Sequence, residues 1–463
     1  MRSHFPVQIT RAAFAAAVAV CAARAARAQS TAAPSSMPPI RPLGKVVAAS
    51  AELLGAVSQV RALPDGRVLV NDNRGRKVAL FDPSLSSFTV VADTTSATAN
   101  AYSSRAGGLI AYKGDSTLFV DPSSLSMLVL DGKGKVARVM SIPRPQEASY
   151  LIGGPNGTPG FDAQGRLVYR GRPDIQIKQA PPGAANSIGG MMMPTIPDSA
   201  ALLRIDLATR KVDTLIWYKT EKQDISVRQT PEGRMSISTT INPMQYLDAW
   251  AVTSDGRVAV VRARDYHVDW VDADGKVASS GKVPFAWRHL DDSAKTAYID
   301  STRAVLEKMR EDVQKRVQQG GMAAIDAMAS DLGGVMGGMA EVRMGSGGSS
   351  RGTANAPPAR GGAAAGISLP PVNMVKPSEL PDYAPPFEAG SVRADEDGNI
   401  WIRTTNVYDG GSVYDIVNGQ GKLTDRVLLP PGRVIAGFAR GGVVFMGVRD
   451  GEGDVRLEKA TLR

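Results

Sequence analysis

Apolar and polar positions along the chain repeat as pairs of short strands joined by tight turns. Each pair has an apolar strand, a turn built on Asp, Gly or Gln, and a second strand rich in Val, Leu and Ile. Gly and Asp supply turn geometry that β-branched residues adopt poorly, and the apolar runs suit strands buried on both faces. The turns fall at Asp65-Gly66, Gly114-Asp115, Gln164-Gly165, Asp255-Gly256, Asp397-Gly398 and Gly441-Gly442. Six such units, each one antiparallel sheet, predict an all-β chain folded as a six-bladed β-propeller.

The first unit shows the repeat most fully. Residues 66–72 read GRVLVND, and after a short loop residues 77–82 read KVALFD. This resembles the NHL repeat, in which G-x-V-x-V-x-D is followed by K/R-V-x-x-F-D; residues 127–136, 202–206, 268–277 and 413–417 fit it more loosely. The chain as a whole resembles secreted bacterial six-bladed propellers of the NHL and TolB-like group. That resemblance implies the fold, while the functions within the group are diverse.

The last unit contains three strands, at 434–439, 443–448 and 455–460. Because an unpaired strand edge is sticky, a closed ring needs a fourth strand. Residues 45–48 (KVVA) precede the first unit and are the candidate, so that the two ends of the chain would join in one sheet.

The division of the chain follows from these units. Residues 1–28 have basic Arg2 and Arg11, an apolar run from Ala12 to Ala23 and a small-residue cleavage site, which predicts a signal peptide and a periplasmic or secreted protein. Residues 29–42 are expected to be a linker, 43–285 blades 1–4, 286–387 an insertion with a helix and a low-complexity loop, and 388–463 blades 5–6. No stretch of the mature chain is long and apolar enough to span a membrane.

Composition narrows the chemistry. The only cysteine, Cys21, lies in the signal, where Val20 disfavours lipoprotein processing, so the mature chain lacks disulfides and thiolate sites. The formal charge is +9, and removing the four arginines of the signal lowers it to +5. The basic residues are dispersed rather than gathered in a stripe, so we expect no nucleic-acid partner.

Three long insertions interrupt the regular spacing, at 173–197, 219–245 and 286–387. The first joins strands two and three of blade 3, and the others join the last strand of one blade to the first strand of the next. In an up-and-down blade both connections emerge on the same face, opposite the Asp/Gly turns. Long loops on one side of a rigid scaffold are where binding and catalysis usually occur.

The largest insertion has two parts. Asp291, Asp292 and Ser293 predict the start of a helix from about 294 to 319. Its expected apolar positions are Ala297, Ile299, Val305, Met309, Val313 and Val317. Residues 320–376 are rich in Gly, Ala, Met, Ser and Pro, which is typical of a flexible segment. Methionines adapt to irregular surfaces and could either contact a partner or pack onto the propeller; they are Met191, Met192, Met193, Met322, Met328, Met336, Met339 and Met344.

Arginines are the main candidate ligand-binding residues. Arg170, Arg262, Arg403 and Arg449 are expected at the ends of second strands, near the loop residues Arg74, Arg76, Arg172 and Arg264. Guanidinium groups bind carboxylates, phosphates and sulfated sugars through paired donors. The neighbouring Asp72, Asp121, Asp265 and Asp450 could instead neutralise them in ordinary ion pairs. Trp250 and Trp401 could stack on a ligand at the channel mouth or pack between blades.

Catalytic motifs are weak. The mature chain has only His267, in a loop, and His289, near the helix start. Asp72, Asn73 and Asp265 are the best carboxylate and amide candidates for a divalent metal, but no metal motif aligns, and we predict no catalytic residues, metal or cofactor. We therefore expect an exported, monomeric binding or scaffolding propeller that holds a protein or an anionic small-molecule or glycan ligand on its loop-bearing face. The alternative is a metal-dependent propeller enzyme, a lactonase-like hydrolase or a lyase.

Overall fold

The structure is a computed structural model of the chain. It describes residues 37–95, 101–103, 107–174, 187–188, 191–192, 196–222, 224–229, 235–320, 371–449 and 453–462, and in the last turns of the long helix, from 316, it describes the backbone alone. The signal peptide and most of the low-complexity segment predicted from the sequence, with its methionines, lie outside these residues. Among the described residues no helix is long and apolar enough to cross a membrane.

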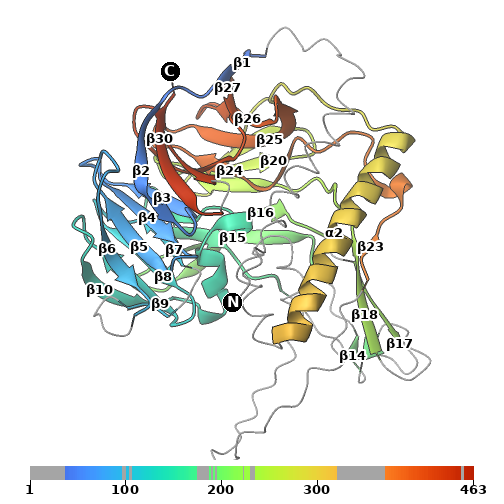
Figure 1. Cartoon of the computed structure of the whole chain (residues 1–463), viewed down its shortest axis with the longest axis horizontal. Coiled ribbons are helices and arrows are strands. Elements are labelled where there is room, and N and C mark those ends of the chain that lie inside the picture. Colours follow the sequence, from blue (N-terminus) through green and yellow to red (C-terminus); the bar gives the residue numbers. More distant parts are fainter. Residues whose placement is uncertain are drawn as a thin grey trace, which may run out of the picture.

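Six antiparallel sheets form the blades of the propeller (Figure 1). Blade 1 contains β3 (Gln59–Ala62), β4 (Val68–Asp72), β5 (Lys77–Phe81) and β6 (Phe88–Asp93). Blade 2 contains β7 (Gly108–Ala111), β8 (Thr117–Asp121), β9 (Ser126–Leu130) and β10 (Val136–Ser141). Blade 3 contains β11 (Gly160–Phe161), β12 (Leu167–Arg170), β15 (Ser199–Ile205) and β16 (Val212–Lys219), and the short helices η1 (Pro145–Leu151) and η2 (Gly154–Asn156) precede it.

The remaining blades follow the same order. Blade 4 contains β19 (Ala249–Val252), β20 (Val258–Arg262), β21 (His267–Val271) and β22 (Val277–Ser279). Blade 5 contains β24 (Phe387–Ala394), β25 (Ile400–Tyr408), β26 (Gly411–Val417) and β27 (Leu423–Leu429). Blade 6 contains β28 (Arg433–Ala439), β29 (Val443–Arg449), β30 (Val455–Thr461) and β2 (Val46–Leu54). The six-bladed propeller predicted from the turn pattern is thus confirmed.

The two ends of the chain close the ring together. β2 pairs antiparallel with β30, so the strand predicted at 45–48 does complete blade 6, and it extends to Leu54. The expected linker at 29–42 is only partly correct, because β1 (Ile40–Pro42) pairs parallel with β27 and adds a fifth strand to blade 5. The Nε of Arg41 donates to Asp425 of β27 at 2.8 Å. The Arg41–Asp425 ion pair and the pairing with β27, the outermost antiparallel strand of blade 5, hold this segment in place.

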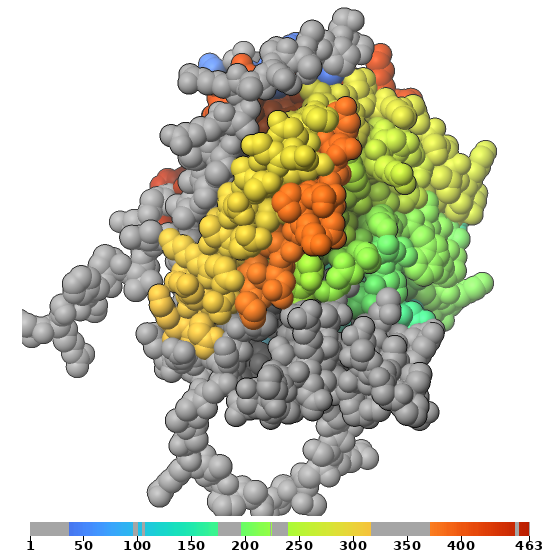
Figure 2. Space-filling view, turned by 90° about the vertical axis from the view of Figure 1, so that its right-hand side faces the viewer, coloured from blue at the N-terminus to red at the C-terminus, as the bar shows by residue number. Residues whose placement is uncertain are grey.

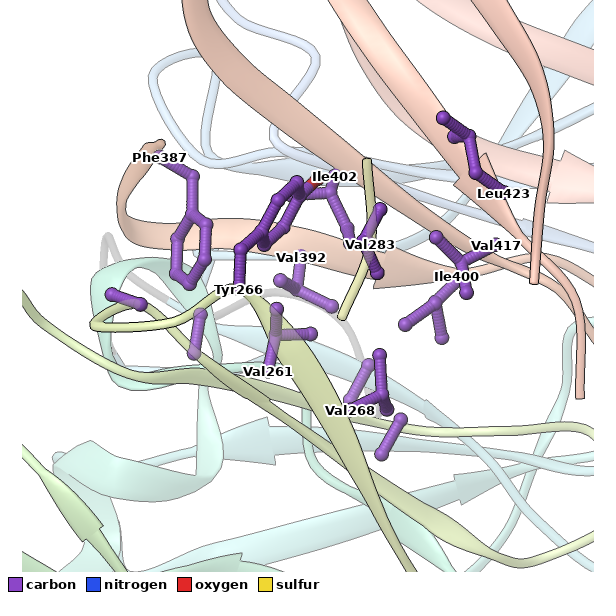
Figure 3. Packing of buried hydrophobic residues seen from close by; sticks show 14 of the residues in the cluster. Val261, Tyr266, Val268, Val283, Phe387, Val392, Ile400, Ile402, Val417 and Leu423 are labelled. Atoms are coloured by element: carbon purple, nitrogen blue, oxygen red, sulfur yellow. The ribbon is translucent and has the colours of Figure 1, made fainter. Parts of the chain in front are cut away.

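A separate apolar core fills each of the six boundaries between neighbouring blades. Between blades 4 and 5, Tyr266 and Phe387 pack with their ring centres 5.8 Å apart, and Val392 and Ile402 complete the contact (Figure 3). Because each strand sends alternate side chains to its two faces, a blade contributes to two cores at once. This explains why the strands read as continuous apolar runs in the sequence.

Polar contacts also join the blades at the end that carries the Asp/Gly turns. The arginine that follows the turn in three blades donates to a backbone carbonyl in the β-turn of the next blade: Arg67 to Gly132, Arg166 to Ala273 and Arg257 to Gly419. The guanidinium of Arg257 also lies 4.6 Å from the ring centre of Trp270. In the same turns Gly256 has φ +82°, and a Cβ there would lie 2.2 Å from the amide nitrogen of Ala163, so glycine is required.

Candidate functional site

The insertions come together at one end of the propeller, which we call the insertion face. It is the end opposite the Asp/Gly turns, because the insertions follow second strands or last strands of blades. β18 (Met235–Ile241) of the second insertion pairs parallel with β23 (Asn373–Met374) of the third, and β17 (Asp224–Gln229) adds an edge strand. In Figure 1 these strands lie beside the long helix α2 (Asp292–Gly320). The described part of the first insertion includes the strand β14 (Met191–Met192). The prediction of a shared face is therefore confirmed for the described residues.

α2 is fixed to the segment that returns to blade 5. Asp291 accepts a hydrogen bond from the amide of Ala294 at 2.7 Å, which caps the helix as the sequence predicts. The buried ammonium of Lys295 donates to Asp382 at 2.7 Å. About three helical turns further along, Glu307 accepts from the amide of Val372 at 3.0 Å. Figure 2 shows α2 lying along the orange residues that include this segment.

The insertions have a small apolar core of their own. It joins residues of the second insertion, of α2 and of the returning segment: Met244, Leu290, Ile299, Val375, Leu380 and Ala384. The expected apolar face of the helix is correct for Ile299 and Val313, which are buried, but Ala297 is exposed. Tyr298, the next residue in the sequence, is half-buried against this core. The side chain of Val317 lies outside the described residues.

Aromatic residues connect this core to the propeller. The rings of Phe285 and Trp287 lie edge to face with centres 5.4 Å apart, and Tyr246 approaches Trp287 at 6.5 Å. The hydroxyl of Tyr246 donates to the carbonyl of Tyr383 at 2.8 Å. His289, near the helix start, forms a backbone bridge with Tyr383 and contacts its ring. The insertion assembly is therefore attached to blades 4 and 5 by packed rings rather than by a flexible linker.

Two of the strand-end arginines are held by partners within the protein. Arg262 donates to Asp248 at 2.8 Å and to Asp269 at 2.7 Å. Arg170 bonds to the side chain of Asn156, and its guanidinium lies 5.0 Å from the ring centre of Tyr150. Arg262 thus ties the segment that enters blade 4 to its second strand. Arg262 therefore forms ordinary ion pairs within the protein, which is one of the two roles that the sequence left open for it.

The arginines in loops differ from those in strands. Arg74, Arg76, Arg172, Arg264 and Arg449 are all exposed. Within the described part of the chain none of their guanidinium groups has a carboxylate partner. Arg74, Arg76, Arg172 and Arg264 follow the second strands of blades 1, 3 and 4, whereas Arg449 is the last residue of the second strand of blade 6. These five residues, called the loop arginines below, surround the insertion face on several sides. Exposed cations without partners are free to meet an anionic surface or ligand.

Arg403 is not at the end of a strand as predicted, because β25 continues to Tyr408. Its guanidinium reaches the exposed carboxylate of Glu388 at 3.4 Å.

Asp72 has a structural role. Its carboxylate is fully buried and accepts from the amides of Gly55, Ala56 and Gly75 at 3.0, 2.8 and 2.7 Å. It therefore ties the segment that enters blade 1 to the loop after β4. Asp121 in blade 2 accepts from Ser103 in the same way, at 2.8 Å from the amide. Both carboxylates therefore accept hydrogen bonds from within the protein.

Asp265 lies 2.8 Å from Nδ1 of His267 on the surface of blade 4. It is not brought together with Asp72 or Asn73, and the described residues contain no group of three or more His, Cys, Asp or Glu side chains placed to hold a metal ion.

Trp250 and Trp401 are each 1% exposed and pack between blades. The indole nitrogen of Trp250 donates to the carbonyl of Asn156 at 3.1 Å, and that of Trp401 donates to Asp395 at 3.0 Å. Neither ring presents a face on which a ligand could stack. Of the two interpretations given for these residues, packing between blades describes their positions.

Arg393, which lies in the innermost strand of blade 5, is not among the residues expected from the sequence to form a site. Burial lowers its pKa from the usual value, and the nearby positive charge of Arg403 lowers it further. The only sequence signal is one arginine inside the strand FEAGSVRA, which looks like a surface position of an alternating strand. The charged and titratable groups near it, Arg403 and Tyr414, come from other strands of the blade, so only the fold reveals its surroundings.

Comparison with known proteins assigns the chain to no family. No protein-family model and no curated protein matches the sequence. Among solved structures it is similar to a member of the DUF4221 family from Bacteroides vulgatus, with 8% identity, a TM-score of 0.38 and coverage of 92% of this chain and 96% of that one. It is similar to virginiamycin B lyase from Staphylococcus aureus, with 10% identity, a TM-score of 0.36 and coverage of 90% and 99%. It is also similar to TolB from Acinetobacter baumannii, with 10% identity, a TM-score of 0.30 and coverage of 88% and 64%.

Proposed function

We propose that the protein is an exported β-propeller that binds an anionic partner, a protein surface or a glycan, on its insertion face. The observation that carries this proposal is the set of exposed loop arginines without carboxylate partners around the face where the insertions assemble. The buried strands of the blades form a rigid support for these arginines. The insertions, which pack around an apolar core of their own, form another part of the same face. A rigid scaffold with charged loops is a usual arrangement for recognition.

The opposite face provides a natural contrast. It carries short turns, and its basic residues are likewise exposed, as at Lys133, Lys135, Lys276 and Arg440. If binding depends on general positive charge, both faces contribute equally. If it depends on the insertion face, only the loop arginines matter.

The test compares two variants with the same change in charge. In the first, Arg74, Arg172, Arg264 and Arg449 are each replaced by Ala; in the second, Lys133, Lys135, Lys276 and Arg440 are. Immobilised heparin serves as the sulfated-glycan probe, and the salt concentration at elution is the readout, because attraction between exposed charges is screened by salt. We expect the insertion-face variant to elute at clearly lower salt than the wild type and the turn-face variant to stay near it. Equal shifts of both variants, or no retention of the wild type, would contradict the proposal.

Export is tested separately from binding. A mature protein collected outside the cytoplasm should begin at Gln29, after cleavage following Ala28, as intact mass and N-terminal sequencing would show. A full-length chain that retains Met1 in the cytoplasm would refute this part of the proposal and leave the binding test unaffected.

A further inference from the structure

Two arginines and a tyrosine share the side of blade 5 that faces blade 6. In the strand ladder Arg393 lies opposite Trp401, and Arg403 lies opposite Tyr414. The neighbours Val392 and Ile402 point into the core between blades 4 and 5 (Figure 3). Because side chains alternate along a strand, Arg393 and Arg403 point to the other side, where Trp401 and Tyr414 meet residues of blade 6.

The position is close to the axis of the propeller. β24 is the innermost strand of its sheet, and Arg393 is near the end of this strand, just before the turn at Asp397-Gly398. Its side chain is half-buried, so water reaches it without surrounding it.

Arg393 has no hydrogen-bond or ion-pair partner within the described part of the chain, although Asp395 and Glu396 follow it closely in the sequence. Asp395 accepts from the indole nitrogen of Trp401 at 3.0 Å and from Asn399. Glu396 lies 3.6 Å from the guanidinium of Arg61 in blade 1. Both nearby acids are therefore engaged elsewhere.

The net charge around Arg393 and Arg403 is positive. Arg403 contacts Glu388 at 3.4 Å, and the carboxylate of Glu388 is 71% exposed, which makes this a weak surface ion pair. Arg403 thus has one loosely held carboxylate partner, and Arg393 has none within the described part of the chain. Burial and the charge of Arg403 lower the pKa of Arg393, as expected when a cation is desolvated beside another cation.

Tyr414 supplies a neutral donor at the same place. Burial raises the pKa of its phenol, so the hydroxyl keeps its proton at neutral pH. The ring is fixed against Trp401, with the ring centres 6.2 Å apart. The cluster therefore has two fork-shaped cationic donors and one rigid hydroxyl, and a half-buried cation that lacks a partner destabilises a fold unless something else favours it.

We propose that Arg393, Arg403 and Tyr414 form a binding site for the oxyanion group of a small ligand, a phosphate or a carboxylate, near the axis of the propeller. Guanidinium groups bind both oxyanions through parallel N–H bonds, and the rigid phenol adds a third donor. The ligand would supply the negative charge that the protein lacks at this point. This site is separate from the exposed loop arginines of the insertion face and does not depend on partner binding there.

The first experiment uses stability. Arg393→Met keeps much of the side-chain volume and removes the charge; Arg440→Met, in an exposed turn, is the matched control. Without added anion we expect Arg393→Met to melt at or above the temperature of the wild type, because it removes an unpaired, half-buried charge. Inorganic phosphate should raise the melting temperature of the wild type and of Arg440→Met saturably, relative to sodium chloride of equal ionic strength. It should give Arg393→Met only the non-saturating rise of an excluded salt.

The second experiment measures binding by calorimetry with inorganic phosphate and with succinate, which separates the two oxyanion classes. Binding of either probe to the wild type should weaken at least tenfold in Arg393→Met and several-fold in Tyr414→Phe, with partial recovery in Arg393→Lys. If neither probe binds the wild type saturably, or if Arg393→Met binds as the wild type does, the site does not exist. Should Arg393→Met fail to fold, Arg393→Lys and Tyr414→Phe carry the same test. The heparin comparison would be unchanged by failure here, so the two proposals fail separately.

Discussion

Asp415 is a buried carboxyl whose protonation should make the stability of the propeller depend on pH. It lies in β26, is 0% exposed, and accepts from the hydroxyl of Tyr266 at 2.9 Å and from Nε of Arg426 at 3.4 Å. Burial raises its pKa from 3.8 to about 6, and the hydrogen bond from Tyr266 and the charge of Arg426 only partly oppose this. The folded protein therefore holds this proton more tightly than the unfolded chain does.

The direction and size of the effect follow from this pKa. A rise from 3.8 to about 6 corresponds to about 3 kcal/mol, because each pH unit between the folded and unfolded pKa is worth about 1.4 kcal/mol. The stabilisation is complete below pH 4 and is lost as the pH rises through about 6. Asp415→Asn keeps the shape and can still accept from Tyr266, but it has no proton to release. We expect this substitution to remove that part of the pH dependence.

Urea unfolding of the wild type and the variant from pH 4 to pH 7 measures the difference. The free energy of unfolding of Asp415→Asn minus that of the wild type should increase by about 3 kcal/mol across this range. Asp454→Asn, at an exposed site, is the control and should show no such trend. A constant difference between Asp415→Asn and the wild type would refute the reasoning, because it would mean that Asp415 has the same pKa in the folded and unfolded chains.

Three other perturbations test how the blades are held. Asp72→Ala should destabilise the protein by about 3–5 kcal/mol, because it leaves three amides without their acceptor. Elemental analysis of this variant should show the same metal content as the wild type. Loss of a stoichiometric metal would instead favour the enzyme alternative. Arg257→Ala should lower the free energy of unfolding by about 1–2 kcal/mol through loss of the contacts with Gly419 and Trp270, and an unchanged value would mean that these contacts contribute nothing. Removing residues 1–54 should expose β30 to proteolysis, whereas removing residues 1–36 should not, because only the first deletion takes away β2; equal cleavage of both would show that β2 does not close the ring.

The candidate sites were only partly accessible to sequence reasoning. The loop arginines could be named because they follow recognisable strand ends, and they are exposed on the expected face. Whether a given arginine has a partner could not be known, because Arg262 meets Asp248 and Asp269 from two other segments, and Arg403 meets Glu388 from the neighbouring strand. Asp72 was a metal candidate by composition, yet its acceptors are used by three amides.

The architecture of the protein could be predicted from local features of its sequence. Alternation, turn residues and the spacing of the six units act locally, so the blades, the closing strand and the capped start of α2 at Asp291 could be predicted. The tertiary structure decided what each polar side chain meets. Arg393 is left without a partner because packing commits Asp395 to Trp401 and brings Glu396 to Arg61 of blade 1. Pairing and burial of charges depend on distances between segments far apart in the chain, and such distances exist only once the ring has closed.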